Sequence, residues 1–140
     1  MSNLALSDFV ARWGDSVAKR RVDLYLPFYS ITFDVAWYFF SQGCVDGVHI
    51  VVKDGEIVAV KVLLKYMNNR PFITSVKLVS KPGARVYMSL NKFIRRFINY
   101  NFQGFYVILT PKGLYSSDQI MLLRYFDAKH SGEIILQVNF

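Results

Sequence analysis

The sequence predicts an α/β (α+β) protein made of two small domains. We expect an N-terminal α/β domain over residues 1–67 and a C-terminal domain, rich in strands with short helices, over residues 68–140. Apolar residues recur at helical spacing in some segments and alternate or run together, as in strands, in others. Glycine, proline and asparagine separate these segments. Residues 67–71 (Met-Asn-Asn-Arg-Pro) are typical of a linker and mark the boundary.

The N-terminal domain is expected to follow the order α-β-α-β-β. A first amphipathic helix is predicted by apolar residues at roughly helical spacing, namely Leu4, Phe9, Val10, Trp13 and Val17. Ser7 and Asp8 would cap this helix or lie in its first turn. Residues 22–26 alternate between apolar and polar side chains and end at Pro27, which predicts a short strand.

A second helix and a β-hairpin complete this domain. The helix carries apolar residues from Phe33 to Phe40 and is closed by Gly43. Because it is apolar on most sides, we expect it to be substantially buried. Residues 48–53 and 57–66 read as two strands, and the Asp54-Gly55 pair between them is a strong hairpin signal.

The C-terminal domain is predicted to alternate strands with two helices. A strand over residues 72–79 is cut by Lys81-Pro82-Gly83. Ser89 can cap a helix with an apolar face (Leu90, Phe93, Ile94, Phe97, Ile98) and a polar, mostly basic one (Lys92, Arg95, Arg96, Asn99). After Gly104, the continuous apolar run of residues 105–109 predicts a central strand.

Two further elements close the chain. Ser116, with Gln119 three residues later, has the form of a capping box, and the helix it starts includes Ile120, Met121, Leu122 and Leu123. Residues 133–140 form the predicted final strand.

Composition limits the protein class. The chain has 140 residues, of which 53% are hydrophobic and 19% charged, so it can bury a core and wholesale disorder is excluded. Cys44 is the only cysteine, which rules out an intramolecular disulfide, and its apolar surroundings indicate a buried, inert thiol. No apolar run reaches the roughly 18 residues that span a membrane, and we expect no secretory or transit peptide at the N-terminus.

The charges are distributed unevenly. Between Glu56 and Asp118 there is no acidic residue, but there are ten basic ones: Lys61, Lys65, Arg70, Lys77, Lys81, Arg85, Lys92, Arg95, Arg96 and Lys112. Residues 1–70 carry eight basic and seven acidic side chains, whereas residues 71–140 carry nine and three. A polyanion is the natural partner of such a segment, and the second half should dominate contact with phosphate. A soluble protein with a basic face and no particular partner remains the alternative.

Three short segments offer the groups that RNA recognition needs, namely cations, a rigid backbone close to the groove and small polar groups. The Lys81–Arg85 turn would set two cations on either side of a sharp corner. Thr110, Lys112 and Gly113 offer a hydroxyl, a charge and close approach at the end of a strand. Taken alone, the Lys81–Arg85 segment is better explained as an ordinary exposed turn, and the Thr110 segment is a short, weak signal that could simply join a strand to a helix.

Ser131-Gly132-Glu133 is the third segment, and it contains the only glutamate of the second half. An anion on an RNA-binding face repels phosphate, so a carboxylate placed there must have a specific role. Glu133 could accept hydrogen bonds from bases or ribose, or orient the Thr110 loop. The alternative is a solvated glutamate that starts an edge strand. Tyr87 could stack on a base or hydrogen-bond into the loops, or be one more core residue.

Residues 80–87 (Ser-Lys-Pro-Gly-Ala-Arg-Val-Tyr), together with the Thr110 and Gly132-Glu133 segments, resemble the bacterial-type small-subunit ribosomal protein eight family, the universal S-eight family. The resemblance implies a non-catalytic protein that binds the central domain of small-subunit rRNA and contacts neighbouring ribosomal proteins. It implies no cofactor, metal, membrane or small-molecule substrate. It also assigns RNA contact to the C-terminal domain and to an arginine of the first helix, giving the set Arg12, Lys81, Arg85, Tyr87, Thr110, Lys112, Gly113, Ser131, Gly132 and Glu133.

The chain also departs from that family's pattern. Leu109 and Pro111 replace two serines of the family's RNA-binding loop, and Gly14 replaces a second arginine. The segment between Ser116 and Glu133 is longer and more apolar than the family's usual connection, which indicates an extra protein neighbour or an altered RNA site. These departures favour a mitochondrial ribosome, with the chain encoded inside the organelle as one option. A bacterial cytoplasm or a plastid is the alternative.

Two other function classes have weaker support in the sequence. A small nuclease would need acid–base or metal-binding groups, but Asp118, Asp127, His130 and Glu133 lack metal-ligand spacing. His49 and Cys44 have no obvious partner either. A peripheral membrane or protein-interaction module could use the aromatic, basic helix over residues 89–99. Its phenylalanines are more simply explained as core residues under a sheet.

Overall fold

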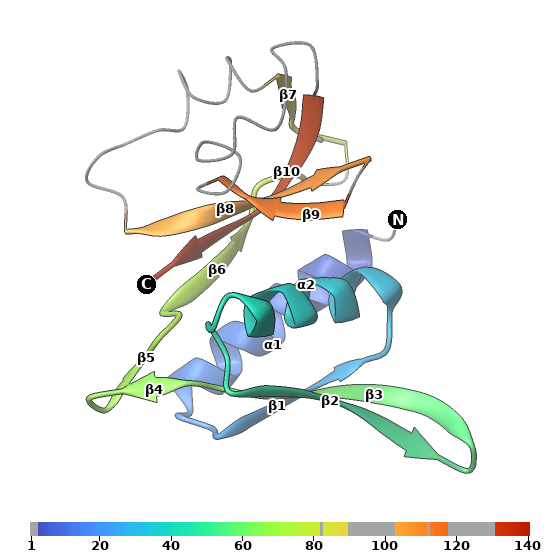
Figure 1. The fold of residues 1–140 in the computed structure, drawn as a ribbon, viewed down its shortest axis with the longest axis vertical. Coiled ribbons are helices and arrows are strands. Elements are labelled where there is room, and N and C mark those ends of the chain that lie inside the picture. The colour runs from blue at the N-terminus through green and yellow to red at the C-terminus, as the bar shows by residue number, and fades with distance from the viewer. Residues whose placement is uncertain (1–2, 82, 90–102, 112, 118–130) are drawn as a thin grey trace. The chain divides into compact units, whose positions relative to one another are not determined.

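The computed structural model describes residues 3–81, 83–89, 103–111, 113–117 and 131–140 (Figure 1). It contains helices and antiparallel sheets, so the predicted α+β class is confirmed. The chain divides into two compact units, one that runs to Val76 and includes Phe140, and one over Lys77–Asn139. The sequence had placed this division between residues 67 and 68.

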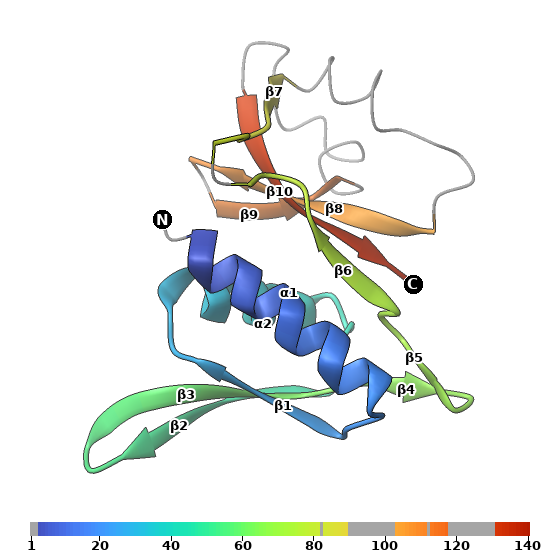
Figure 2. The ribbon, with the colours of Figure 1, turned by 180° about the vertical axis from the view of Figure 1, so that it is seen from behind.

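The N-terminal unit has the predicted α-β-α-β-β order: α1 (Asn3–Ala18), β1 (Asp23–Pro27), α2 (Ser30–Ser41), β2 (Gly47–Lys53) and β3 (Glu56–Leu63). The three strands form an antiparallel sheet in the order β1-β3-β2. Both helices cover one face of it (Figures 1 and 2). The core between helices and sheet contains the rings of Phe9, Trp13 and Phe39, whose centroids lie 5.6–6.0 Å apart. Val60 and Val62 of β3 are fully buried.

Two details of the helices differ from prediction. Because α1 begins at Asn3, Ser7 and Asp8 lie in its second turn rather than at its cap, and Asp8 instead bonds Arg12 one turn later. Helix α2 is less buried than its composition predicted. Trp37 and Phe40 are 51% and 39% exposed, whereas Phe39 is fully buried, so only one side of the helix faces the core.

The hairpin signal is confirmed, since Asp54 and Gly55 join β2 to β3 with positive φ angles of 52° and 79°. That conformation matches the twist of paired strands. The predicted second strand is shorter than expected, because β3 ends at Leu63. The predicted linker contains a second small hairpin, formed by β4 (Tyr66–Met67) and β5 (Arg70–Pro71).

Gly14 lies inside α1 with open space where a Cβ would be. Glycine in a helix interior costs up to about 1 kcal/mol relative to alanine, because its unfolded backbone has more freedom. We therefore expect Gly14→Ala to raise the free energy of unfolding of the N-terminal unit by about 0.5–1 kcal/mol. Urea unfolding followed by the fluorescence of Trp13 and Trp37, both in this unit, measures it; a loss of stability would contradict the expectation.

The C-terminal sheet has the order β6-β10-β8-β9, and β7 also pairs with β10. Its strands are β6 (Ser75–Leu78), β7 (Tyr87–Ser89), β8 (Gly104–Thr110), β9 (Gly113–Ser116) and β10 (Ser131–Asn139). Strand β8 has a neighbour on each side, so its prediction as a central strand is confirmed. The sequence missed β9, since the loop after Thr110 was expected to lead to a helix and instead turns back into a hairpin.

Both helices predicted for the second half fall outside the described residues. This applies to the helix after Ser89 with Lys92, Arg95 and Arg96, and to the helix containing Gln119 and residues 120–123. Ser89 and Ser116, the predicted caps, are the last residues of β7 and β9. Within the described part of the chain, no helix is long and apolar enough to cross a membrane.

Candidate functional site

Most of the predicted site residues meet around the first part of β10. Glu133 pairs with Tyr87 of β7 on one side and with Leu109 of β8 on the other. Glu133 therefore lies between the loop of residues 80–87 and the β8–β9 turn. Segments that lie some 50 and 20 residues away in sequence are brought to one place by strand pairing.

Ser80 anchors the basic loop. Its side chain is buried, and its Oγ donates a hydrogen bond of 2.7 Å to the Ile134 carbonyl and accepts one of 2.9 Å from the Val86 amide. Lys81 and Ala84 close the turn with mutual backbone bonds of 3.2 and 2.9 Å. Sequence reasoning gave Ser80 no role, although serine beside a Pro-Gly turn is a known signal for side-chain bonds to the backbone. This hydroxyl holds the loop against β10.

Gly83 supplies the conformation that the turn requires. Its φ is +79°, in the region that glycine adopts without strain. Lys81 and Arg85 lie exposed on either side of the corner, as predicted.

Glu133 is buried and ion-paired with Arg85. The distance from its Oε1 to the Nη1 of Arg85 is 3.3 Å, and only 4% of the glutamate side chain is exposed against 37% of the arginine side chain. A solvated glutamate on an edge strand is therefore wrong, because β10 has strands on both sides. The carboxylate therefore holds Arg85 at its Nη1, while 37% of the arginine side chain stays accessible.

Tyr87 is the exposed aromatic residue of the site, with 62% of its surface accessible. Its interpretation as a core residue is therefore wrong. Residues directly opposite each other in an antiparallel pair share a face, so Tyr87 and Glu133 lie on the same face of the sheet. An accessible ring beside an arginine is the arrangement on which a nucleobase can stack.

Thr110 and Gly132 lie on the other face, because side chains alternate along a strand. The Thr110 hydroxyl donates to the Gly113 carbonyl at 2.8 Å, so its proton closes the β8–β9 turn. Only 7% of Thr110 is exposed. A Cβ at Gly132 would lie 2.6 Å from Cγ2 of Ile108 and 3.3 Å from Cγ2 of Thr110, so this position requires glycine.

The remaining predicted residues are not part of this cluster or lie outside the description. Lys112 falls outside the described residues, and Ser131 is described only through its backbone, which pairs with Ser89. Arg12 belongs to the N-terminal unit. Its Nε bonds Asp8 at 2.8 Å and its Nη1 donates to the Tyr25 carbonyl at 3.3 Å.

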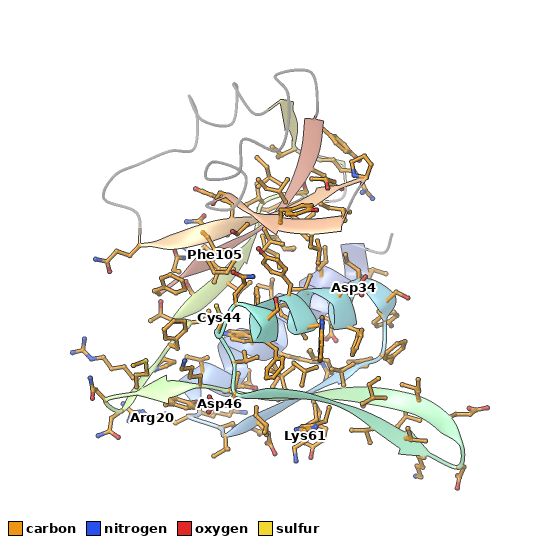
Figure 3. The ribbon with its side chains drawn as sticks, viewed as in Figure 1. Arg20, Asp34, Cys44, Asp46, Lys61 and Phe105 are labelled. Carbon is orange, nitrogen blue, oxygen red and sulfur yellow. The ribbon has the colours of Figure 1, made fainter. Side chains whose placement is uncertain are left out.

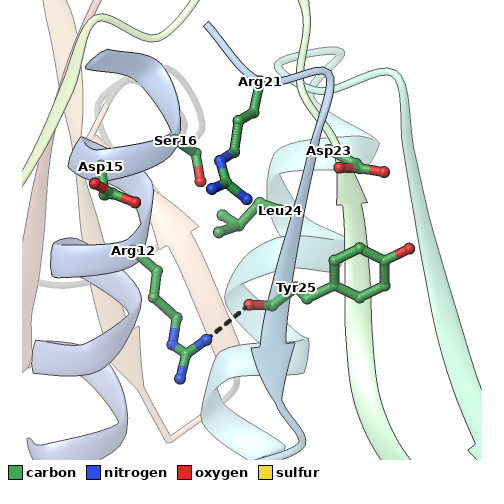
Figure 4. Close-up of a pocket in the computed structure, with 7 residues that line it drawn as sticks. All are labelled: Arg12, Asp15, Ser16, Arg21, Asp23, Leu24 and Tyr25. Carbon is green, nitrogen blue, oxygen red and sulfur yellow. Dashed lines mark hydrogen bonds between the residues drawn. The ribbon is translucent and has the colours of Figure 1, made fainter. Parts of the chain in front are cut away.

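Arg12 lines a pocket of about 140 Å³, together with Asp15, Ser16, Arg21, Asp23, Leu24 and Tyr25 (Figure 4). The guanidinium groups of Arg12 and Arg21 are both drawn on the same side of β1 in this view. Two arginines here are balanced by two aspartates, so the pocket is less cationic than the loop around Lys81.

The described side chains that could serve in catalysis do not gather into one site. No set of three or more His, Cys, Asp and Glu side chains there lies close enough to hold a metal ion. Cys44 is buried, as predicted; burial raises the pKa of its thiol, and nearby Lys65 only partly opposes this. Such a thiol is a poor nucleophile. Asp118, Asp127 and His130 lie outside the described residues.

Comparison with known proteins places this arrangement in a family. Residues 5–138 match the model of the family described as ribosomal protein S8. The small ribosomal subunit protein uS8 of Caulobacter sp. (strain K31) is 30% identical over 138 residues, 97% of each chain. That of Anaplasma phagocytophilum is 33% identical over 110 residues, covering 78% of this chain and 80% of its own. The small ribosomal subunit protein uS8m of Acanthamoeba castellanii is 29% identical over 89 residues, 64% of each chain. The chain belongs to the ribosomal protein S8 family.

Proposed function

We propose that this protein is a structural, non-catalytic constituent of the small ribosomal subunit that binds the central domain of small-subunit rRNA directly. Its C-terminal unit makes the main contact, and Lys81, Arg85 and Tyr87 carry it. The Thr110–Gly113 turn approaches the RNA beside them, and Arg12 adds a contact from the N-terminal unit. Neighbouring small-subunit proteins are its other partners.

One observation carries this proposal. In the described part of the C-terminal unit, three basic side chains are exposed (Lys77, Lys81 and Arg85), and the single acidic one, Glu133, is buried and paired. Among the described residues of this unit, phosphate would therefore meet exposed cations and no exposed carboxylate. The family membership and the exposed ring of Tyr87 support RNA over other polyanions.

Binding to the matching rRNA fragment across a salt series tests the proposal. We expect affinity to fall steeply with salt, because each neutralised phosphate releases counterions. Lys81→Ala should reduce the slope of log K against log salt by about 0.7–0.9, the contribution of one phosphate contact. Lys53→Ala, a matched loss of charge at the exposed β2–β3 turn, should leave the slope unchanged. Affinity that does not depend on salt would overturn the proposal.

We propose a mitochondrial small subunit as the particle in which the protein works. The uS8m relative and the alphaproteobacterial relatives support this location over a plastid. Co-sedimentation with mitochondrial small subunits in high salt is the expected result. Co-sedimentation only with bacterial-type cytoplasmic subunits would favour the alternative.

A further inference from the structure

The β2–β3 hairpin extends past both helices of the N-terminal unit (Figures 1 and 2). Where the helices cover it, Val60 is fully buried. On the same hairpin, Ile50, Val52 and Ile57 are 44%, 59% and 47% exposed. The hairpin thus carries large β-branched side chains into solvent.

These exposed residues continue the core face of the sheet. Ile50 pairs with the buried Val60, and Val52 pairs with Ile57. The three exposed side chains therefore share the face on which Val60 is buried. Lys61 lies on the opposite face and points away from the helices, within 3.8 Å of Asp23 (Figure 3). The uncovered strip is therefore a prolongation of the core, and a contiguous apolar patch of this kind marks an interaction site.

The backbone beside the strip is also open. Strand β2 is the outermost in the order β1-β3-β2, and among the described strands none pairs with its other edge. Natural edge strands are usually protected by charge, proline or a bulge. Val48–Val52 contains neither charge nor proline, and at the register shift near Val52 the extra residue is on β3. Such an edge invites an added strand.

Charge argues against RNA as the occupant. The residues between Gly47 and Val58 contain Lys53, Asp54 and Glu56, a net charge of −1, in a chain whose net charge is +7. This acidic end of the hairpin suits a partner that presents basic side chains next to an apolar strand. Main-chain pairing with side chains placed in an apolar strip is the known mode of strand addition.

We propose that the free edge of β2 receives an extended strand from a neighbouring protein of the small subunit, with apolar side chains covering Ile50, Val52 and Ile57 and basic residues facing the acidic turn. The location of that partner in the small subunit rests on the proposed function above. Strand addition would bury the exposed strip and satisfy the open backbone groups together.

Hydrogen exchange of the β2 amides tests this in three states of the full chain: free, bound to the rRNA fragment, and within purified small subunits. We expect residues 48–53 to exchange at least tenfold more slowly only in the third state. Equal protection by the RNA fragment would make RNA the occupant. Protection of the free chain that rises with its concentration would make it a second copy. Either of these two results overturns the inference. So does fast exchange of the β2 amides within the small subunit.

A pair of variants sharpens the test. Val52→Lys places a charge on the strip, and Val22→Lys makes the same change at a side chain that is 72% exposed and outside the hairpin. Both should fold and bind the rRNA fragment, because exposed substitutions change stability little. Only Val52→Lys should lose β2 protection in the particle; equal loss in both variants contradicts strand addition. A chain absent from small subunits overturns the proposed function as well, whereas a chain that is present with an open edge overturns only this inference.

Discussion

Arg85→Ala is expected to reduce the free energy of unfolding of the C-terminal unit by about 2 kcal/mol and to weaken rRNA binding about tenfold. Breaking a buried ion pair by removing one partner costs about 3–5 kcal/mol, because the remaining charge is left without compensation. Here that charge is the Glu133 carboxylate, 4% exposed. We expect less than the full cost because the arginine side chain is 37% exposed, so water already screens the pair. The lost affinity corresponds to one charged contact with phosphate or base.

A double variant separates the two roles of Arg85. In Arg85→Ala/Glu133→Gln the buried group is neutral, so most of the lost stability should return, to within about 1 kcal/mol of the unmodified chain. RNA affinity should stay low, because the cation is still missing. Exchange of the β10 amides reports the stability of this unit, and binding to the rRNA fragment reports the affinity. If the double variant regains both, Arg85 acts only through the fold and its assignment as an RNA contact is wrong.

The sequence predicted the local elements better than the long-range ones. Asp54-Gly55 specifies a hairpin through its own backbone preferences, so its prediction required nothing from the rest of the chain. Strand β9 was missed because Gly113–Ser116 has only four residues and no distinctive pattern. It exists because Val107–Thr110 of β8 offers a pairing edge. The exposure of Trp37 has the same origin, since composition does not reveal which side of a helix a sheet covers.

Several residues of the predicted site lie close together in the structure, but the sequence did not indicate the contacts between them. The sequence singled out Lys81, Arg85 and Glu133 without relating them, because residues 85 and 133 lie 48 positions apart and meet only through strand pairing. An acid-free segment indicates a polyanion partner, but it cannot indicate that the one nearby acid is buried beneath an arginine. The role of Ser80 was missed for the same reason, as its acceptor is the carbonyl of Ile134 in a distant strand.

Gly132→Ala is expected to destabilise the C-terminal unit by about 1–3 kcal/mol, the range for forcing an extra group into a packed site. The added Cβ would lie 2.6 Å from Cγ2 of Ile108 and 3.3 Å from the carbonyl oxygen of Leu109. Ile108 is buried and branched at Cβ, so this methyl group cannot swing aside without an unfavourable rotamer. The backbone of β10 must shift instead. The part that shifts lies between Tyr87 and the turn at Thr110.

The same substitution should therefore act on binding as well as on stability. We expect rRNA affinity to fall severalfold even under conditions in which Gly132→Ala is fully folded, because Tyr87 and Arg85 are positioned through the displaced part of β10. Gly14→Ala is the matched control, since its Cβ meets open space and should stabilise the chain. Exchange of the β10 amides and binding to the rRNA fragment measure both effects. If the β10 amides of Gly132→Ala exchange at the unchanged rate, β10 and β8 can separate at this end without loss of stability. The site would then be less rigid than its hydrogen bonds indicate.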